Sequence, residues 1–195
     1  MPQSSATPSA RKVELLEAAY RYALTHGLAG LSLRPLAKEI GSSPRVLLYL
    51  FGSKEGLVQA LLTRARADEL ELLADLRAEP PESSADDRLV EVAERLWAWL
   101  AADEHRALLK LWLEGYARSL VEPEGVWAGF ARATVADWLD VLATAQPERV
   151  RRSQEGLAQR TQVLALLRGA LLDLLATGDV DRTTAAVRRQ LRASR

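Results

Sequence analysis

The 195-residue chain contains no cysteine, only one methionine and only two histidines. The absence of cysteine excludes disulfide bonds and thiolate metal sites, and it is compatible with a reducing compartment. With two histidines and no cysteine, a metal effector is not expected. No run of eighteen apolar residues occurs, and the amino terminus lacks the basic and apolar regions of a signal peptide. We therefore expect a cytoplasmic protein without a membrane span.

The sequence also lacks the residue groupings of an enzyme active site. It shows no Ser/His/Asp grouping, no metal-ligand spacing and no glycine-rich phosphate loop. Carboxylate pairs such as Asp137 and Asp140 are more simply read as solvated helix faces. Neither an enzymatic activity nor a cofactor is predicted.

Charge is balanced overall but unevenly distributed. The chain holds 26 basic and 26 acidic residues, yet residues 1–64 hold eight Lys or Arg and four Glu. The amino-terminal third is therefore net +4 and the remainder net −4. A basic segment on a neutral protein is the pattern expected for a polyanion partner.

Leucine and alanine are abundant and β-branched residues are few, which favours helices throughout and predicts an all-α fold. Residues 1–10 read as a disordered tail, and Pro80-Pro81 ends the helix that begins at Lys54. In the first helix we expect a buried stripe of Val13, Leu16, Ala19/Tyr20 and Ala23/Leu24. Besides the two short helices described next, helices are expected near 11–26, 54–79, 85–101, 104–121, 124–145, 152–176 and 180–192.

Residues 32–51 read as two short helices joined by a tight turn. Ser32 is placed to cap the first helix, and Gly41 is suited to the left-handed conformation at its end. Ser43 then caps the second helix, with Pro44 at its first position. Leu47, Leu50 and Phe51 turn inward, whereas Arg45, Leu48 and Tyr49 lie on the opposite face. The pattern indicates a DNA-reading helix-turn-helix, and an ordinary helical hairpin is the alternative.

A third helix follows directly and is capped by Ser53. Its first-turn Lys54 is disfavoured by the helix dipole unless an anion binds there. A DNA phosphate meets that condition, because free backbone N–H groups and the ammonium would then face the same anion. The alternative is a solvated lysine.

These residues resemble the DNA-binding domain of the TetR (tetracycline-repressor) family, over residues 11–62. The family pattern runs approximately T-x-R-x-I/L-A-x-x-A-G-V-S-x-G-x-L-Y-x-x-F-x-S-K-E-x-L. Three positions depart from it: Ser42 replaces valine, Arg45 replaces glycine or alanine, and Leu48 replaces a tyrosine that commonly touches phosphate. Positions that fit it are Ser32, Arg34, Leu36, Ala37, Gly41, Ser43, Leu47, Phe51, Ser53, Lys54, Glu55 and Leu57.

The resemblance implies a DNA-binding amino-terminal domain, followed over residues 63–195 by a domain that binds an effector and dimerises. The residues expected at the DNA are Ser32, Arg34, Ser43, Pro44, Arg45, Val46, Leu48, Tyr49 and Lys54. Tyr49 lies next to the position of the family tyrosine, where it is a candidate for phosphate or base contact.

Aromatic residues gather in the predicted second domain. An aromatic pocket with a few polar groups is typical of a small-molecule site, although each single aromatic is more often core. Trp97 and Trp99 are two residues apart and cannot share one helix face. The candidate effector-binding residues are Trp97, Trp99, His105, Trp112, Tyr116, Trp127 and Phe130.

The helices near 124–145 and 152–176 are the candidates for self-association. The second is apolar nearly all round, so it must be buried on more than one side. In the resembled family the equivalent pair joins its symmetry mate in a four-helix bundle, which implies a C₂ homodimer. The expected interface residues are Trp138, Leu142, Leu164, Leu167 and Leu171.

The sequence thus predicts a DNA-binding regulator. The leading hypothesis is a repressor released from a palindromic double-stranded DNA operator by a small apolar or aromatic effector, and an activator would have the same sequence features. The alternatives are an all-helical protein-interaction module or ligand-binding protein that uses the helix-turn-helix only as scaffold.

Overall fold

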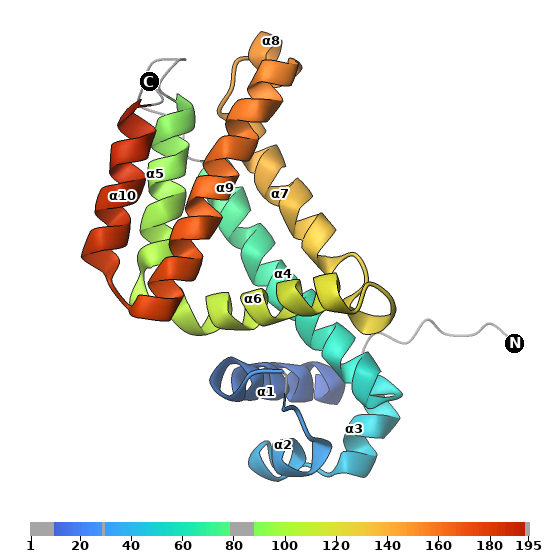
Figure 1. Ribbon diagram of the computed structural model, residues 1–195. Helices are drawn as coiled ribbons and strands as arrows, with labels where there is room; N and C mark the ends of the chain where they lie inside the picture. Colours follow the sequence, from blue (N-terminus) through green and yellow to red (C-terminus); the bar gives the residue numbers. More distant parts are fainter. Residues whose placement is uncertain (1–9, 29, 79–87, 194–195) are drawn as a thin grey trace, which may run out of the picture. The chain divides into compact units, whose positions relative to one another are not determined.

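The computed structural model describes residues 10–28, 30–78 and 88–193, and these residues form α-helices and two short 3-10 helices without any strand (Figure 1). The all-α prediction is confirmed. Of the predicted tail, only Ala10 lies within the described residues, where it opens α1. The predicted break at Pro80-Pro81 lies outside them.

Internal contacts divide the chain into two compact units. Unit 1 comprises Met1–Ala67 and Lys110–Phe130, and unit 2 comprises Asp68–Leu109 and Ala131–Arg195. One division point lies inside a single continuous helix, α4 (Lys54–Ala78). The predicted division after residue 62 differs, because Lys110–Phe130 clusters with the amino-terminal unit.

Unit 1 is built on four helices from the start of the chain. They are α1 (Ala10–His26), α2 (Leu33–Glu39), α3 (Pro44–Phe51) and the first part of α4. The later part of α6 (Arg106–Val121) and the 3-10 turn η2 (Gly125–Trp127) complete it. Leucines from these helices form a core that water does not reach, among them Leu15, Leu36, Leu47, Leu57 and Leu61.

The buried face of α1 differs in part from the prediction. Val13 is half exposed, whereas Leu15 is buried together with Ala19, Tyr20 and Ala23. The stripe is therefore rotated at the amino-terminal end of the helix, where Leu15 takes the place of Val13.

A carboxylate joins α6 to the end of α1 within unit 1. The backbone N–H of Leu28 donates a 2.7 Å hydrogen bond to Glu114 Oε2. Gly27 makes this approach possible, since its φ of +76° is in the left-handed region and a Cβ there would lie 3.1 Å from the same oxygen.

Unit 2 is a bundle in which α5 (Arg88–Ala101), α9 (Gln154–Thr177) and α10 (Val180–Ala193) lie side by side (Figure 1). The 3-10 turn η1 (Asp103–His105), α7 (Phe130–Thr144) and α8 (Glu148–Arg151) complete the element list. Phe130 itself is counted with unit 1. The core of unit 2 is made mainly of leucine, with Leu96, Leu142, Leu167, Leu174 and Leu191 nearly inaccessible.

One expected helix begins later than predicted. The sequence predicted a helix over 124–145, but α7 begins only at Phe130, after η2. Gly125 and Gly129 adopt φ values of +83° and +73°, which a regular helix cannot accommodate. The expected helix over 152–176 is observed as α9.

The five residues predicted to form a dimer interface are all buried within the single chain, with exposures between 0% and 6%. They pack in the core of unit 2. Because this packing already occupies them, they are not available at the surface for a second copy. These residues are Trp138, Leu142, Leu164, Leu167 and Leu171.

Candidate nucleic-acid interface

The first helix of the motif, α2, begins after Ser32, which has the extended backbone of a capping residue. Its hydroxyl makes no capping hydrogen bond, so the prediction that this side chain caps α2 is wrong. Its carbonyl instead accepts the first helical bond, from Leu36 N at 3.2 Å. The exposed hydroxyl of Ser32 and the neighbouring exposed Arg34 both remain at the surface at the start of α2.

The turn between α2 and α3 is set by Gly41. Its φ is +65°, and the following Ser42 N–H donates a 2.8 Å hydrogen bond back to Ala37 O. This closes the last turn of α2 in the manner of a glycine-terminated helix and confirms the prediction for Gly41.

The second helix, α3, begins as predicted. Ser43 Oγ accepts a hydrogen bond from Val46 N at 3.3 Å, and Pro44 occupies the first helical position. Because Pro44 has no N–H group, it leaves no donor unsatisfied there.

The two faces of α3 differ sharply in exposure. Leu47 is 1% exposed and Phe51 9%, whereas Tyr49 is 87% exposed. Val46 and Leu48 are exposed at 38% and 42%, and Arg45 also lies at the surface. The inward leucine and phenylalanine hold the helix on the core, so α3 presents one arginine, one tyrosine and two aliphatic side chains outward.

The amino terminus of α4 provides a second polar element. Ser53 Oγ accepts a hydrogen bond from Gly56 N at 3.0 Å, which confirms the predicted cap. Lys54 is exposed in the first turn. The pKa of Glu55 lies below its usual value because of hydrogen bonds with its own backbone and with Ser53, to which the charge of Lys54 adds.

Gly56 places this helix start against the end of α3. A Cβ at Gly56 would lie 2.2 Å from the backbone oxygen of Phe51, closer than any real side chain permits. Sequence reasoning missed this residue. Its only signal was a glycine in the first turn of an otherwise leucine-rich helix.

A second contact made by the end of α3 involves a cation of α1. Lys12 Nζ lies 5.4 Å from the centroid of the Phe51 ring, in range of a cation–π interaction. Lys12 is therefore positioned at the same end of α3 as Gly56.

The predicted effector-binding residues fall into two groups, one in each unit. In unit 2, Trp97 is buried and donates a 3.0 Å hydrogen bond to Thr184 Oγ1. His105 stacks on Trp99 with ring centroids 3.9 Å apart. Its Nδ1 lies 2.9 Å from the Trp99 carbonyl, which requires the proton on that nitrogen.

In unit 1, Trp112 and Tyr116 lie on successive turns of α6 with ring centroids 5.2 Å apart. Phe130 lies against Gly115 of the same helix, because a Cβ on Gly115 would lie 3.2 Å from its ring. Trp127 is buried in η2. The structure thus pairs the rings of Trp112 and Tyr116 and places the Phe130 ring against the same helix at Gly115.

The described part of the chain contains neither a membrane-spanning helix nor a metal-binding cluster. None of the helices there is long and apolar enough to cross a membrane. Within the same residues, no three His, Cys, Asp or Glu side chains gather as a metal site would require.

Residues 15–61 match the family model described as bacterial regulatory proteins, tetR family. This stretch contains all of α2 and α3 and the start of α4, that is, the whole outward surface described above. A search of the curated proteins found no match.

Solved structures with the same fold cover nearly the whole chain. A TetR transcription regulator from Haloarcula marismortui is 17% identical with a TM-score of 0.71, and the match covers 95% of this chain and 96% of that one. A putative transcriptional regulator from Saccharomonospora viridis in complex with choline is 22% identical, with a TM-score of 0.71 and 95% coverage of both chains. The multidrug binding protein EbrR complexed with proflavin is 26% identical with a TM-score of 0.64, over 93% of this chain and 99% of that one.

Proposed function

We propose that this chain is a transcriptional regulator of the tetR family, and specifically a repressor that leaves a palindromic operator when a small molecule binds. The observation that carries the proposal is the outward face of α3. Arg45, Val46, Leu48 and Tyr49 are exposed there while Leu47 and Phe51 anchor the helix. We place this face in the major groove of DNA and assign its neighbours, Ser32, Arg34 and Lys54, to the phosphates.

Each outward side chain of α3 has a distinct chemistry for DNA. Arg45, at the start of the helix, suits a bidentate contact with guanine. Val46 and Leu48 offer apolar surface to a thymine methyl group. Tyr49 offers a hydroxyl to a base or a phosphate. Ser43 and Pro44 hold the amino terminus of the helix, whose free N–H groups favour a phosphate.

A palindromic operator requires two copies of α3, and we propose a homodimer formed through the exposed face of α9. This face holds small and apolar residues at helical spacing, and Leu172 is half exposed on it. Small residues permit a close helix approach, and burial of Leu172 favours it. The residues of this face are Ala158, Thr161, Ala165, Gly169, Leu172 and Ala176.

For the effector, we propose the aromatic cluster of Trp112, Tyr116 and Phe130. Offset aromatic rings beside a glycine suit a flat or apolar molecule. Two solved structures of this fold hold small molecules, choline in the regulator from Saccharomonospora viridis and proflavin in the multidrug binding protein EbrR. Trp97, Trp99 and His105 lie in unit 2 and are not part of this cluster.

The path from effector to DNA would run along α6, which carries both the aromatic cluster and Glu114. Glu114 is one turn or less from Trp112 and Tyr116, and it binds the backbone at the end of α1. We propose that a ligand-induced shift of α6 moves this carboxylate and with it the helix-turn-helix. Such coupling requires the effector to prefer one of the two arrangements.

We further propose that the chain acts in the cytoplasm and by binding alone, without catalysis. The test selects binding sites from random DNA with the full chain and then places the selected site across a promoter that drives a reporter. The proposal predicts a two-fold symmetric site and lower reporter expression when the regulator is present. Raised expression would make it an activator, and the absence of any selected sequence would favour a protein-interaction module.

A further inference from the structure

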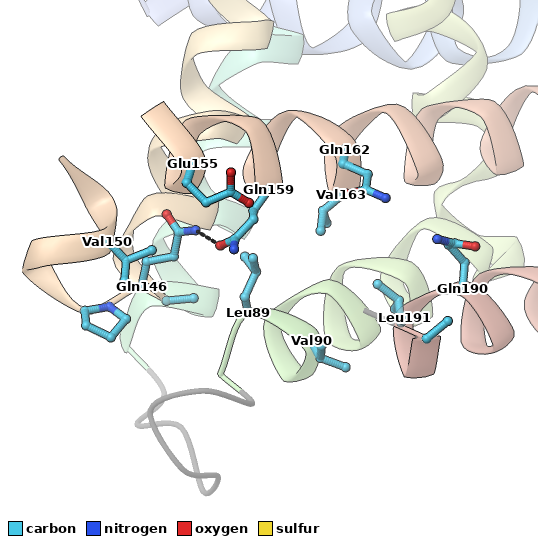
Figure 2. Close-up of a pocket in the computed structure, with 13 residues that line it drawn as sticks. Leu89, Val90, Gln146, Val150, Glu155, Gln159, Gln162, Val163, Gln190 and Leu191 are labelled. Atoms are coloured by element: carbon cyan, nitrogen blue, oxygen red, sulfur yellow. Dashed lines mark hydrogen bonds between the residues drawn. The ribbon is translucent and has the colours of Figure 1, made fainter. Parts of the chain in front are cut away.

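A pocket of about 540 Å³ opens in unit 2, lined by the starts of α5 and α9, the segment from the end of α7 through α8, and the end of α10 (Figure 2). This volume is in the range of small-molecule sites. None of the aromatic residues considered above lines it. Its apolar lining comes from aliphatic residues such as Leu89, Val150 and Val163, and its polar lining is almost entirely glutamine. The polar residues are Gln146, Glu155, Gln159, Gln162 and Gln190.

Behind the pocket wall lies a buried cation. Arg160 is 8% exposed, and its Nη1 donates to Gln146 Oε1 and, at 3.2 Å, to the Arg151 carbonyl. None of the described carboxylates forms an ion pair with it. A buried guanidinium paired only with neutral acceptors polarises them strongly, because the low local dielectric strengthens the interaction.

The hydrogen bonds that lead from Arg160 to the pocket have only one possible direction. A guanidinium donates and never accepts, so the Gln146 oxygen must face Arg160. Gln146 Nε2 then donates to the Gly156 carbonyl at 3.1 Å and to Gln159 Oε1 at 3.1 Å. Because the Gln159 oxygen already accepts from Gln146, the Gln159 NH₂ group is the last donor in this series of hydrogen bonds. Figure 2 shows that group on the side of Leu89.

The wall that holds these glutamines is tightly built. Arg151 Nε donates to the Ala143 carbonyl at 2.8 Å and thereby caps the end of α7. Gly156 packs so closely on α8 that a Cβ there would lie 2.0 Å from Val150 O. The position of Gln159 is therefore fixed before any ligand arrives, which lowers the entropic cost of binding.

The lining also defines the charge and shape of a ligand. Among the described residues that line the pocket, Glu155 is the one that carries a charge, and none is Lys or Arg. An anion would lose its water there and gain no cationic contact. None of these described lining residues is aromatic, so they offer no surface for flat stacking ligands, whereas an aliphatic chain matches Leu89, Val150 and Val163.

We propose that this pocket binds an uncharged aliphatic molecule through a carbonyl oxygen that accepts a hydrogen bond from Gln159 Nε2. The site is separate from the aromatic cluster assigned to the effector, and it does not depend on that assignment. Arg160 and Gln146 are positioning residues, since they act only by orienting Gln159.

The test compares two probes that differ by a single carbonyl oxygen, methyl hexanoate and methyl hexyl ether. Each is titrated into the full-length protein while the glutamine side-chain amide resonances are followed by NMR. We expect the ester to shift the Gln159 amide resonance and to bind about five- to tenfold more tightly than the ether, as one additional buried hydrogen bond implies. Hexanoate at neutral pH should bind more weakly than the ester.

Gln159→Glu removes the donor but keeps an acceptor for Gln146, so the fold is retained. In this variant the ester should bind no better than the ether. Gln154→Glu is the matched control, with the same change on the same helix at an exposed residue outside the pocket, and it should leave ester binding unchanged. Equal affinity for ester and ether, unchanged binding in Gln159→Glu, or no shift of the pocket amides with either probe would each overturn the proposal.

Discussion

At the scale of single residues, Arg45 and Lys54 are both exposed cations of the amino-terminal unit, yet they occupy different places. Arg45 lies in the first turn of α3, on the face that carries Leu48 and Tyr49. Lys54 lies in the first turn of α4, next to the Ser53 cap. A base contact is sequence-dependent and a phosphate contact is not, so the two residues make separable predictions.

We expect Arg45→Ala to weaken operator binding by about 1–3 kcal/mol and to relax preference at one base pair in each half-site. Lys54→Ala should weaken binding to all DNA alike and reduce the slope of log K against log salt by about one. Titrations on operator and unrelated DNA at several salt concentrations measure both effects. A uniform loss in both variants would reduce Arg45 to a backbone contact.

The residues on the outward face of α3 were predictable from the sequence. Some of the contacts that position the surrounding helices were not. Spacing placed Leu47 and Phe51 inward and Tyr49 outward, because one helical period decides both faces. The Ser32 cap failed, since a favourable residue type does not ensure that its hydroxyl turns toward the helix. Glu114 was not predictable, because it lies 86 residues from its backbone partner Leu28.

At the scale of elements, the junction of α3 and α4 depends on the missing side chain of Gly56. In Gly56→Ala the new methyl group would collide with the Phe51 carbonyl, which is backbone and cannot rotate away. We expect a loss of about 2–4 kcal/mol in the free energy of unfolding, measured by urea denaturation.

Gly30→Ala is the control for this change. Gly30 has an ordinary φ, and a Cβ there meets nothing within 4 Å. It should change stability by less than about 1 kcal/mol. Equal effects of the two substitutions would show that the close approach at Gly56 is not a constraint.

The contact between α6 and α1 makes a second prediction at this scale. Glu114→Leu leaves the Leu28 N–H without its acceptor and should cost about 1–3 kcal/mol. Glu114→Gln retains a carbonyl acceptor and should cost less. Amide hydrogen exchange at Leu28 reports the contact directly: exchange should accelerate strongly in the leucine variant and little in the glutamine variant. Unchanged protection in Glu114→Leu would contradict the role given to this carboxylate.

Helix positions followed from the sequence where caps and glycines were unambiguous, as at Ser43 and Gly41. They failed where two glycines stood close together. Gly125 and Gly129 both take positive φ and delay α7 to Phe130. In α1, Val13 and Leu15 were both plausible inward residues, and only packing against neighbouring helices decided between them.

At the scale of the whole molecule, association through α9 predicts which exposed leucine is needed for the dimer. Leu172→Glu should convert a dimer to a monomer, because a charge would be buried without a partner in the interface. Leu120 is also exposed, at 64%, but lies on α6. Leu120→Glu should therefore leave the dimer intact. Light scattering of the two variants at equal concentration decides, and two dimers would place the interface elsewhere.

The predicted dimer residues show why sequence could not locate this surface. Leu164, Leu167 and Leu171 are as apolar as residues of a protein interface, but they are buried in the core of unit 2. Composition indicates that a helix such as α9 is buried on several sides. It does not indicate which side meets its own chain and which meets a second copy.

Two copies of α3 are expected to contact one operator, and a hydroxyl-radical footprint of the full-length protein on its selected site measures this. Two recognition helices of a two-fold dimer lie about 34 Å apart, or roughly one DNA turn. We expect two protected patches with that spacing, related by two-fold symmetry and both lost in Leu172→Glu at concentrations where the unchanged protein protects them. A single protected patch, or even protection without symmetry, would contradict it.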